Sequence, residues 1–185
     1  MKITLVRHGE TEENVRGIIQ GQQPGHLTER GREQAFAAAG KLKGRHFDAI
    51  YCSDLQRCLD TAEPIRQAFP DVPFVIDRQL RERYGGNFEG QPLELLEPHR
   101  VSGDWYSFRL PGGGESWDDT RLRQVPFLNQ LFEKYPKGSV LVISHGGPVR
   151  GIRSLLEGRS LEDIDAEGTP NAGIWEETMT GPLHG

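Results

Sequence analysis

The sequence has little cysteine and no long apolar run. Its two cysteines, Cys52 and Cys58, have a spacing that fits neither a CxxC pair nor a zinc site. No apolar run approaches the roughly 18 residues that a membrane span requires, and no signal-peptide pattern precedes the first predicted strand. We therefore expect no disulfide scaffold, no thiolate metal site and no membrane association, and a reducing, cytoplasmic location.

An excess of positive charge is also absent. The chain has 22 basic and 27 acidic residues, which gives a net charge of −5. Affinity for nucleic acid depends on a broad basic surface, so we expect no nucleic-acid partner. A few arginines gathered in a cleft can still attract a small anion to an acidic protein.

The composition that remains is typical of a globular protein. The chain has 185 residues, of which 35% are hydrophobic and 26% charged, and this is enough to bury a core. No internal repeat, low-complexity stretch or linker divides it. We therefore expect a single domain over residues 1–185.

Short apolar runs alternate with amphipathic stretches along the chain. Pro64 and Pro126 fall inside two of the predicted helices, which they should kink, bend or end. The segment 85–114 is rich in glycine and charge, so loops with one short helix are expected there. The alternation indicates an α/β fold, a three-layer α/β/α sandwich with a mostly parallel central sheet. Strands are predicted at residues 3–6, 49–52, 73–76, 139–143 and 174–176, and helices at 28–44, 55–69, 117–135 and 149–156.

Three of the predicted strands end in reactive polar residues. Arg7 and His8 follow the first, Ser53 and then Arg57 follow the second, and His145 follows the fourth. Each residue taken alone has an ordinary explanation as a surface ion pair, a solvated helix residue or a capped turn. Ligands of open α/β sheets bind beyond the carboxyl ends of the strands, so together these residues predict a functional site.

Two arginines and two histidines at one sheet edge favour an anion. Arginine matches the oxygens of phosphate or carboxylate. The histidines lack acidic neighbours at metal-ligand spacing, and the arginines would repel a cation, so we expect no metal. A phosphoryl group would use all four side chains. Arg7 and Arg57 should lower the pKa of His8, which leaves a neutral nucleophile.

Several motifs resemble those of one family. The pattern RHGxTxxN at the end of the first strand is similar to the signature of the histidine phosphatase superfamily, the phosphoglycerate mutase-like proteins. The pattern is nearest to small α-ribazole and broad-specificity phosphatases, and it implies their fold. The supporting segments are residues 7–14 (RHGETEEN), 27–35 (LTERGREQA), 53–62 (SDLQRCLDTA), 80–82 (LRE), 88–90 (FEG), 111–116 (PGGGES) and 142–147 (VISHGG).

The resemblance implies hydrolysis of a small phosphate ester with no cofactor. His8 corresponds to the nucleophile that becomes phosphohistidine. Glu82 corresponds to the acid that protonates the leaving oxygen, so it must hold a proton at working pH. The phosphate clamp corresponds to Arg7, Arg57 and His145, assisted by Asn14 and the backbone of Gly146, and the substrate entrance to Gln20 and Gly21.

Two other functions stay open. A phosphoglycerate mutase is the nearer alternative, but such mutases resemble this chain less after Gly90, because they carry a longer insertion with a lysine and paired arginines. Here only Arg100 and Arg109 could hold a substrate carboxylate. A phosphate-binding module without chemistry is the second alternative, although the chain keeps both His8 and Glu82. The oligomeric state is equally open, with a homodimer as one candidate.

Overall fold

A five-stranded sheet forms the centre of the protein. The computed structural model describes residues 1–100 and 105–184. The sheet order is β3-β2-β4-β1-β5; β5 pairs antiparallel with β1, and the other pairings are parallel. This confirms the predicted mostly parallel sheet. The strands are β1 (Lys2–Arg7), β2 (Ala49–Cys52), β3 (Phe74–Ile76), β4 (Ser139–Ser144) and β5 (Ile174–Thr178).

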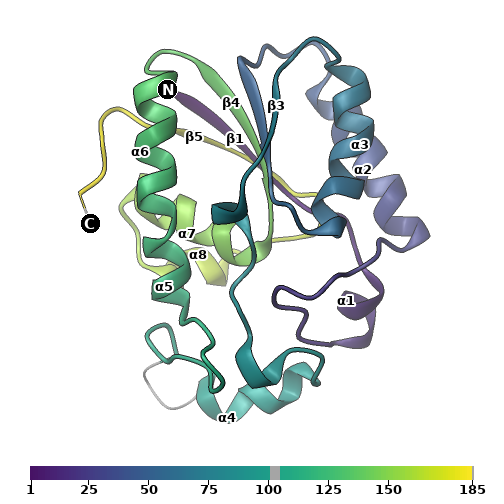
Figure 1. Cartoon of the computed structure of the whole chain (residues 1–185), viewed down its shortest axis with the longest axis vertical. Coiled ribbons are helices and arrows are strands. Elements are labelled where there is room, and N and C mark those ends of the chain that lie inside the picture. The colour runs from purple at the N-terminus through teal and green to yellow at the C-terminus, as the bar shows by residue number, and fades with distance from the viewer. Residues whose placement is uncertain (101–104, 185) are drawn as a thin grey trace.

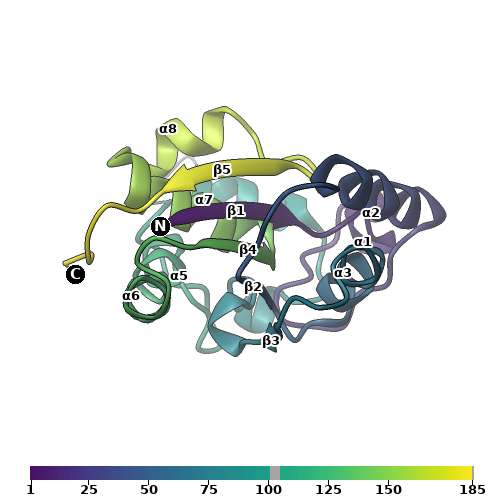
Figure 2. The same ribbon diagram turned by 90° about the horizontal axis from the view of Figure 1, so that it is seen from above.

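Helices cover both faces of the sheet, so the predicted three layers are observed. Figures 1 and 2 show α2 and α3 on one side and α5 to α8 on the other. The helices are α1 (Glu12–Arg16), α2 (Glu29–Leu42), α3 (Gln56–Ala68), α4 (Glu97–Arg100), α5 (Trp117–Leu122), α6 (Gln124–Lys134), α7 (Gly146–Glu157) and α8 (Leu161–Ala166). In the described ranges, 1–100 and 105–184, no helix combines the length and apolar character needed to cross a membrane.

β4 is apolar on both faces at residues 140–143, and β1 is apolar between its two end residues apart from the buried Thr4, because each face of the sheet carries helices. In β1, Ile3 and Leu5 pack with the buried residues of α6 and α7, whereas Val6 packs with those of α2 and α3. Alternate residues of a strand point to opposite faces, so an unbroken apolar run is what a doubly covered strand requires. The polar residues that follow these runs are thereby placed at the sheet edge.

Neither Pro64 nor Pro126 ends a helix. Pro64 lies inside α3, which continues to Ala68; packing of this helix, the buried proline included, outweighs the one hydrogen bond that proline removes. The predicted helix bent at Pro126 is instead two helices, and the break lies at Arg123. Pro126 occupies the first turn of α6, where its missing N–H would have no helical partner anyway.

The segment after β3 covers the carboxyl ends of the strands. It contains the 3₁₀ turns η1 (Arg78–Leu80), η2 (Gly86–Phe88) and η3 (Leu93–Leu96) and then α4, which lies at the bottom of Figure 1. A small apolar cluster that includes Ile19, Leu96 and Leu110 holds this segment together. The predicted short helix is α4, whereas the prediction missed the short helices α1 and α8.

Candidate active site

The carboxyl ends of β1, β2 and β4 bring the predicted residues together. Arg7 pairs in register with Ser144, so His8 and His145 follow side by side. Their ring centroids lie 5.3 Å apart with an interplanar angle of 61°. Arg57, in the first turn of α3, donates from Nε to Nδ1 of His145 over 3.1 Å. The convergence predicted for these four side chains is therefore observed.

His8 is held in one protonation state and one tautomer. Burial, and then the charges of Arg57 and Arg7, keep its pKa well below the usual value, so the ring is neutral near pH 7. Its Nδ1 lies 2.7 Å from the carbonyl oxygen of Gly9. Because a carbonyl can only accept, Nδ1 carries the proton and Nε2 keeps its lone pair. Nε2 is the atom with which a neutral imidazole can act as a nucleophile.

Gly9 fixes the backbone beside this ring. A Cβ on Gly9 would lie 2.4 Å from the carbonyl oxygen of Gly31, and a Cβ on Gly31 would lie 2.1 Å from that of Glu10. The N–H of Gly9 also donates to Oγ1 of Thr61 over 2.9 Å. The first turn of α2 therefore packs directly on the loop that carries His8, which only two facing glycines permit.

His145 is fully buried and does not line the cavity. Its Nδ1 accepts from Arg57, so Nε2 carries the proton and lies 2.8 Å from Oγ of Ser53. Burial, followed by the charges of Arg57, His8 and Arg7, holds its pKa well below the usual value. The neutral ring thus accepts a hydrogen bond from Arg57 and packs against His8 without reaching the cavity.

Arg7 and Arg57 differ in how many of their donors are used. Arg57 is 1% exposed and also donates to the carbonyl oxygens of Gln23 over 2.9 Å and Gly21 over 2.7 Å. Arg7 donates from Nη1 to the carbonyl of Thr169. Its buried Nε has no hydrogen-bond partner among the described residues. Burial lowers the pKa of Arg7 to about 10, so the group stays charged and offers an unused donor next to His8.

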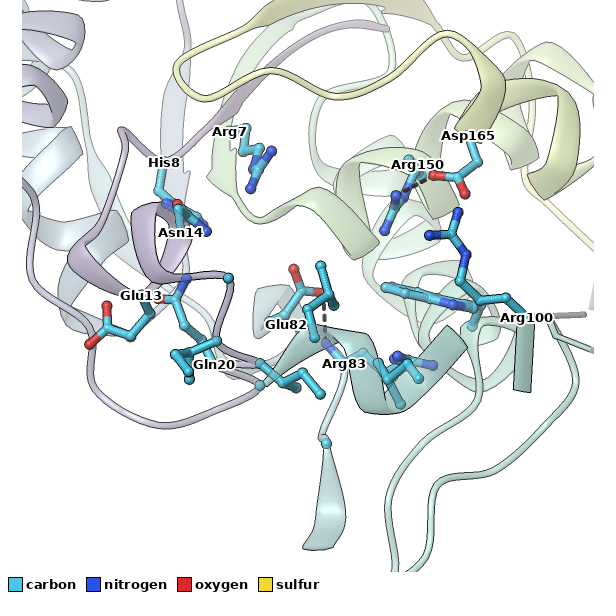
Figure 3. A pocket seen from close by; sticks show the side chains of 18 of the residues that line it. Arg7, His8, Glu13, Asn14, Gln20, Glu82, Arg83, Arg100, Arg150 and Asp165 are labelled. Atoms are coloured by element: carbon cyan, nitrogen blue, oxygen red, sulfur yellow. Dashed lines mark hydrogen bonds and ion pairs between the residues drawn. The ribbon is translucent and has the colours of Figure 1, made fainter. Parts of the chain in front are cut away.

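Glu82 lies at the N-terminus of α7. Its carboxylate accepts from the N–H of Arg83 over 2.8 Å and from the N–H of Gly147 over 3.2 Å. A Cβ on Gly147 would lie 2.2 Å from Oε1 of Glu82, so glycine is required for this contact. Figure 3 shows Glu82 between Arg7 and Arg83. The carboxylate of Glu82 is thus held on the wall of the cavity that His8 also lines.

Comparison with known proteins agrees with this geometry. A model of the histidine phosphatase superfamily, branch 1, matches residues 3–181. The chain belongs to this superfamily. Membership of this superfamily implies a phosphate ester as substrate.

Individual relatives have several phosphatase activities in their names. A metal-independent phosphoserine phosphatase of Arabidopsis thaliana is 40% identical over 160 residues, which are 82% of this chain and 66% of that protein. The adenosylcobalamin/α-ribazole phosphatase of Salmonella typhimurium is 33% identical over 95% of this chain and 84% of its own. A mycobacterial glucosyl-3-phosphoglycerate phosphatase, solved with vanadate (VO3), is 29% identical with a TM-score of 0.84, covering 95% of this chain and 90% of that one.

The remaining predicted residues of this histidine phosphatase lie around a cavity of about 320 Å³. Asn14, Gln20 and Gly21 line it. Oδ1 of Asn14 accepts from the N–H of Thr11 over 3.2 Å, which caps α1 and orients the side chain. Gly146 is the first residue of α7, and a Cβ there would lie 3.6 Å from Nε of Arg7. The structure therefore brings all nine predicted residues to one region, with seven on the cavity wall.

The far wall of the cavity was not predicted from the sequence. Arg83, Trp117 and Arg150 line it together with Asp165. One signal was available: Arg150 is four residues after Gly146, so it shares a face of α7 with the start of that helix. The described residues contain no group of three or more His, Cys, Asp or Glu side chains that could hold a metal ion.

Proposed function

We propose that this histidine phosphatase hydrolyses small phosphate monoesters through a phosphohistidine on His8. The observation that supports the proposal best is the neutral tautomer of His8, whose Nε2 keeps its lone pair, together with the unused Nε donor of Arg7 on the wall of the same cavity. Three relatives that are named phosphatases also support it. A single catalytic domain over residues 1–185 is part of the proposal.

In the first step, Nε2 of His8 attacks phosphorus in line with the ester oxygen. The N–P bond forms as the P–O bond breaks, and the proton of the Glu82 carboxyl moves to the leaving oxygen. Arg7 and Arg57 stabilise the charge on the phosphoryl oxygens, which is the main requirement of phosphoryl transfer.

In the second step, water attacks the phosphohistidine. The carboxylate of Glu82 accepts the proton of the water, the N–P bond breaks, and inorganic phosphate leaves. His8 is returned to its neutral form with Nδ1 still bonded to Gly9. We assign Asn14 and the backbone of Gly146 to the phosphate, Gln20 and Gly21 to the entrance, and His145 to support of the clamp.

A direct experiment is turnover of p-nitrophenyl phosphate in EDTA, with chemical trapping of the phosphoenzyme. His8→Ala should show neither turnover nor a trapped phosphoryl group. His46→Ala is the matched control, because the side chain of His46 is 81% exposed and lines a surface at the opposite end of the sheet. Activity that persists in His8→Ala, or that requires a divalent metal, would refute the mechanism.

Mutase activity is tested on the same protein. Water is the acceptor in the proposed reaction, whereas a mutase returns the phosphoryl group to a second hydroxyl. Incubation of 3-phosphoglycerate with and without 2,3-bisphosphoglycerate should release inorganic phosphate and form little 2-phosphoglycerate. Rapid isomerisation without phosphate release would assign the chain to the mutases instead.

A further inference from the structure

A buried arginine lies on the cavity wall away from His8 and has an unused donor. Arg83 is 5% exposed and stacks on Trp117, with Cζ 3.7 Å from the ring centroid. Its Nη1 is buried and has no hydrogen-bond partner within residues 1–100 and 105–184. Burial lowers the pKa of Arg83 to about 10, so it is charged near neutral pH. A charged donor buried without a partner is costly, and packing on tryptophan alone does not satisfy it.

Trp117 offers a second unused donor in the same place. Its Nε1 is also buried without a hydrogen-bond partner in the described ranges, and the residue lines the cavity. Buried tryptophan N–H groups usually find an acceptor. Two buried donors with no acceptor among residues 1–100 and 105–184 therefore indicate that an acceptor arrives with the ligand.

The local charge is consistent with a monoanion. Arg150 lies over Trp117, with Cζ 4.5 Å from the ring centroid, and it forms an ion pair with Asp165. With Glu82 in the protonated form that the proposed first step uses, the guanidinium groups of Arg83 and Arg150 against the carboxylate of Asp165 leave one formal positive charge. Arg100, at the rim, is matched by Glu97 at 3.2 Å and adds no net charge.

This second group of side chains faces the leaving-group side of the site. Figure 3 shows Arg83, Arg100 and Arg150 gathered at the end of the cavity away from His8, with Glu82 between the two ends. A phosphoryl group held by Arg7 would place its ester oxygen toward Glu82, so the rest of the substrate extends toward Arg83. A cavity of about 320 Å³ admits only a small leaving group.

We infer that Arg83, Trp117 and Arg150 form a subsite for a carboxylate on the leaving group, so that the substrates are small phosphorylated carboxylic acids. The planar fork of arginine and the indole N–H suit two carboxylate oxygens, and a single uncompensated positive charge suits a monoanion better than a second phosphate. The inference rests on the proposed phosphatase activity, and it narrows the substrate of the same site.

A matched pair of substrates tests it on the wild-type protein. Glycerol 3-phosphate and 3-phosphoglycerate share a three-carbon skeleton and differ in a hydroxymethyl group or a carboxylate. We expect kcat/KM to be roughly tenfold to a hundredfold higher for 3-phosphoglycerate, as a hydrogen bond to a charged group predicts. Equal values would overturn the inference and leave the proposed phosphatase intact. Failure to hydrolyse any ester, p-nitrophenyl phosphate included, would overturn both.

Variants then test which side chain causes the preference for 3-phosphoglycerate over glycerol 3-phosphate. Arg83→Met should bring the ratio of the two kcat/KM values close to one, mainly through KM for 3-phosphoglycerate. Arg45→Met is the control, because Arg45 is exposed and pairs with Glu176 outside the cavity, and it should keep the wild-type ratio. A preference that survives in Arg83→Met would overturn the assignment of this side chain. Faster hydrolysis of 1,3-propanediol bisphosphate than of 3-phosphoglycerate would overturn the choice of carboxylate.

Arg150→Met provides a second test if Arg83→Met fails to fold. It should reduce the same ratio, because it removes the second guanidinium and leaves Asp165 unpaired near the carboxylate. Thermal denaturation measured beside the kinetics identifies a variant that has lost its fold. An Arg150→Met protein that is folded and keeps the wild-type preference would count against the subsite.

Discussion

The contact between Gly147 and Glu82 predicts a specific defect in proton donation. In Gly147→Ala the new Cβ would lie 2.2 Å from Oε1 of Glu82 and 2.9 Å from Cζ3 of Trp117. An ordinary contact of about 3.4 Å requires the carboxyl to move by about 1.2 Å. A displacement of this size in an active site can cost about a hundredfold in rate.

The assay compares two esters that differ in how much they need the acid. Phenyl phosphate has a poor leaving group, whereas p-nitrophenolate leaves without a proton. We expect kcat/KM of Gly147→Ala to fall by about a hundredfold on phenyl phosphate and much less on p-nitrophenyl phosphate. The melting temperature should fall modestly, because the tip of Glu82 can move and alanine is the better helix residue, whereas the ring of Trp117 must shift slightly to relieve the 2.9 Å contact.

Gly40→Ala is the matched control. Gly40 also lies in a helix, α2, and a Cβ there would have no heavy atom within 4 Å. This variant should keep both activities. The reasoning would be wrong if Gly147→Ala kept wild-type activity on phenyl phosphate, or if it lost the same factor on both esters while remaining folded.

Three further predictions concern the clamp and the nucleophile. Gly9→Ala should lose stability and activity together in urea unfolding and turnover assays, because its Cβ would meet the rigid carbonyl of Gly31 at 2.4 Å. The pKa of His8 is lower in the folded protein than in the unfolded chain. The free energy of unfolding should therefore fall as pH drops below about 6.5, by up to about 1.4 kcal/mol per pH unit for this imidazole. Urea titrations at several pH values should give His8→Gln a shallower slope of unfolding free energy against pH than the wild-type protein has, whereas His46→Gln should keep the wild-type slope. Vanadate and inorganic phosphate should inhibit competitively, and Arg7→Met should raise both inhibition constants; equal inhibition of that variant would exclude Arg7 from the clamp.

Those site residues that directly follow buried strands could be predicted from the sequence. Arg7, His8 and His145 end or follow apolar runs, and the parallel pairing of β1 with β4 places them side by side. Such residues can be found because a strand's direction and the polarity of its last positions are both visible in the sequence. Arg57 followed from the same reasoning, since it lies in the first turn after β2.

Other features depend on contacts between distant segments and left no local pattern. The tautomer of His8 is set by one backbone carbonyl, and the position of Glu82 by a glycine in α7. The stack of Arg83 on Trp117 joins a loop residue after η1 to the first residue of α5, and no periodicity connects two positions so far apart in the sequence. The helix break at Arg123 also escaped prediction, because the proline three residues later was the more visible signal.

Arg57 spans two parts of the protein that are usually considered separately. One edge of its guanidinium meets the ring of His145, and the other binds two carbonyls of the loop that borders the entrance. Lysine at this position would conserve the charge, but a single ammonium cannot hold three acceptors in these directions. Such a lysine would therefore loosen the loop at the entrance as well as weaken anion binding. One side chain thus couples the binding of the anion to access to the cavity.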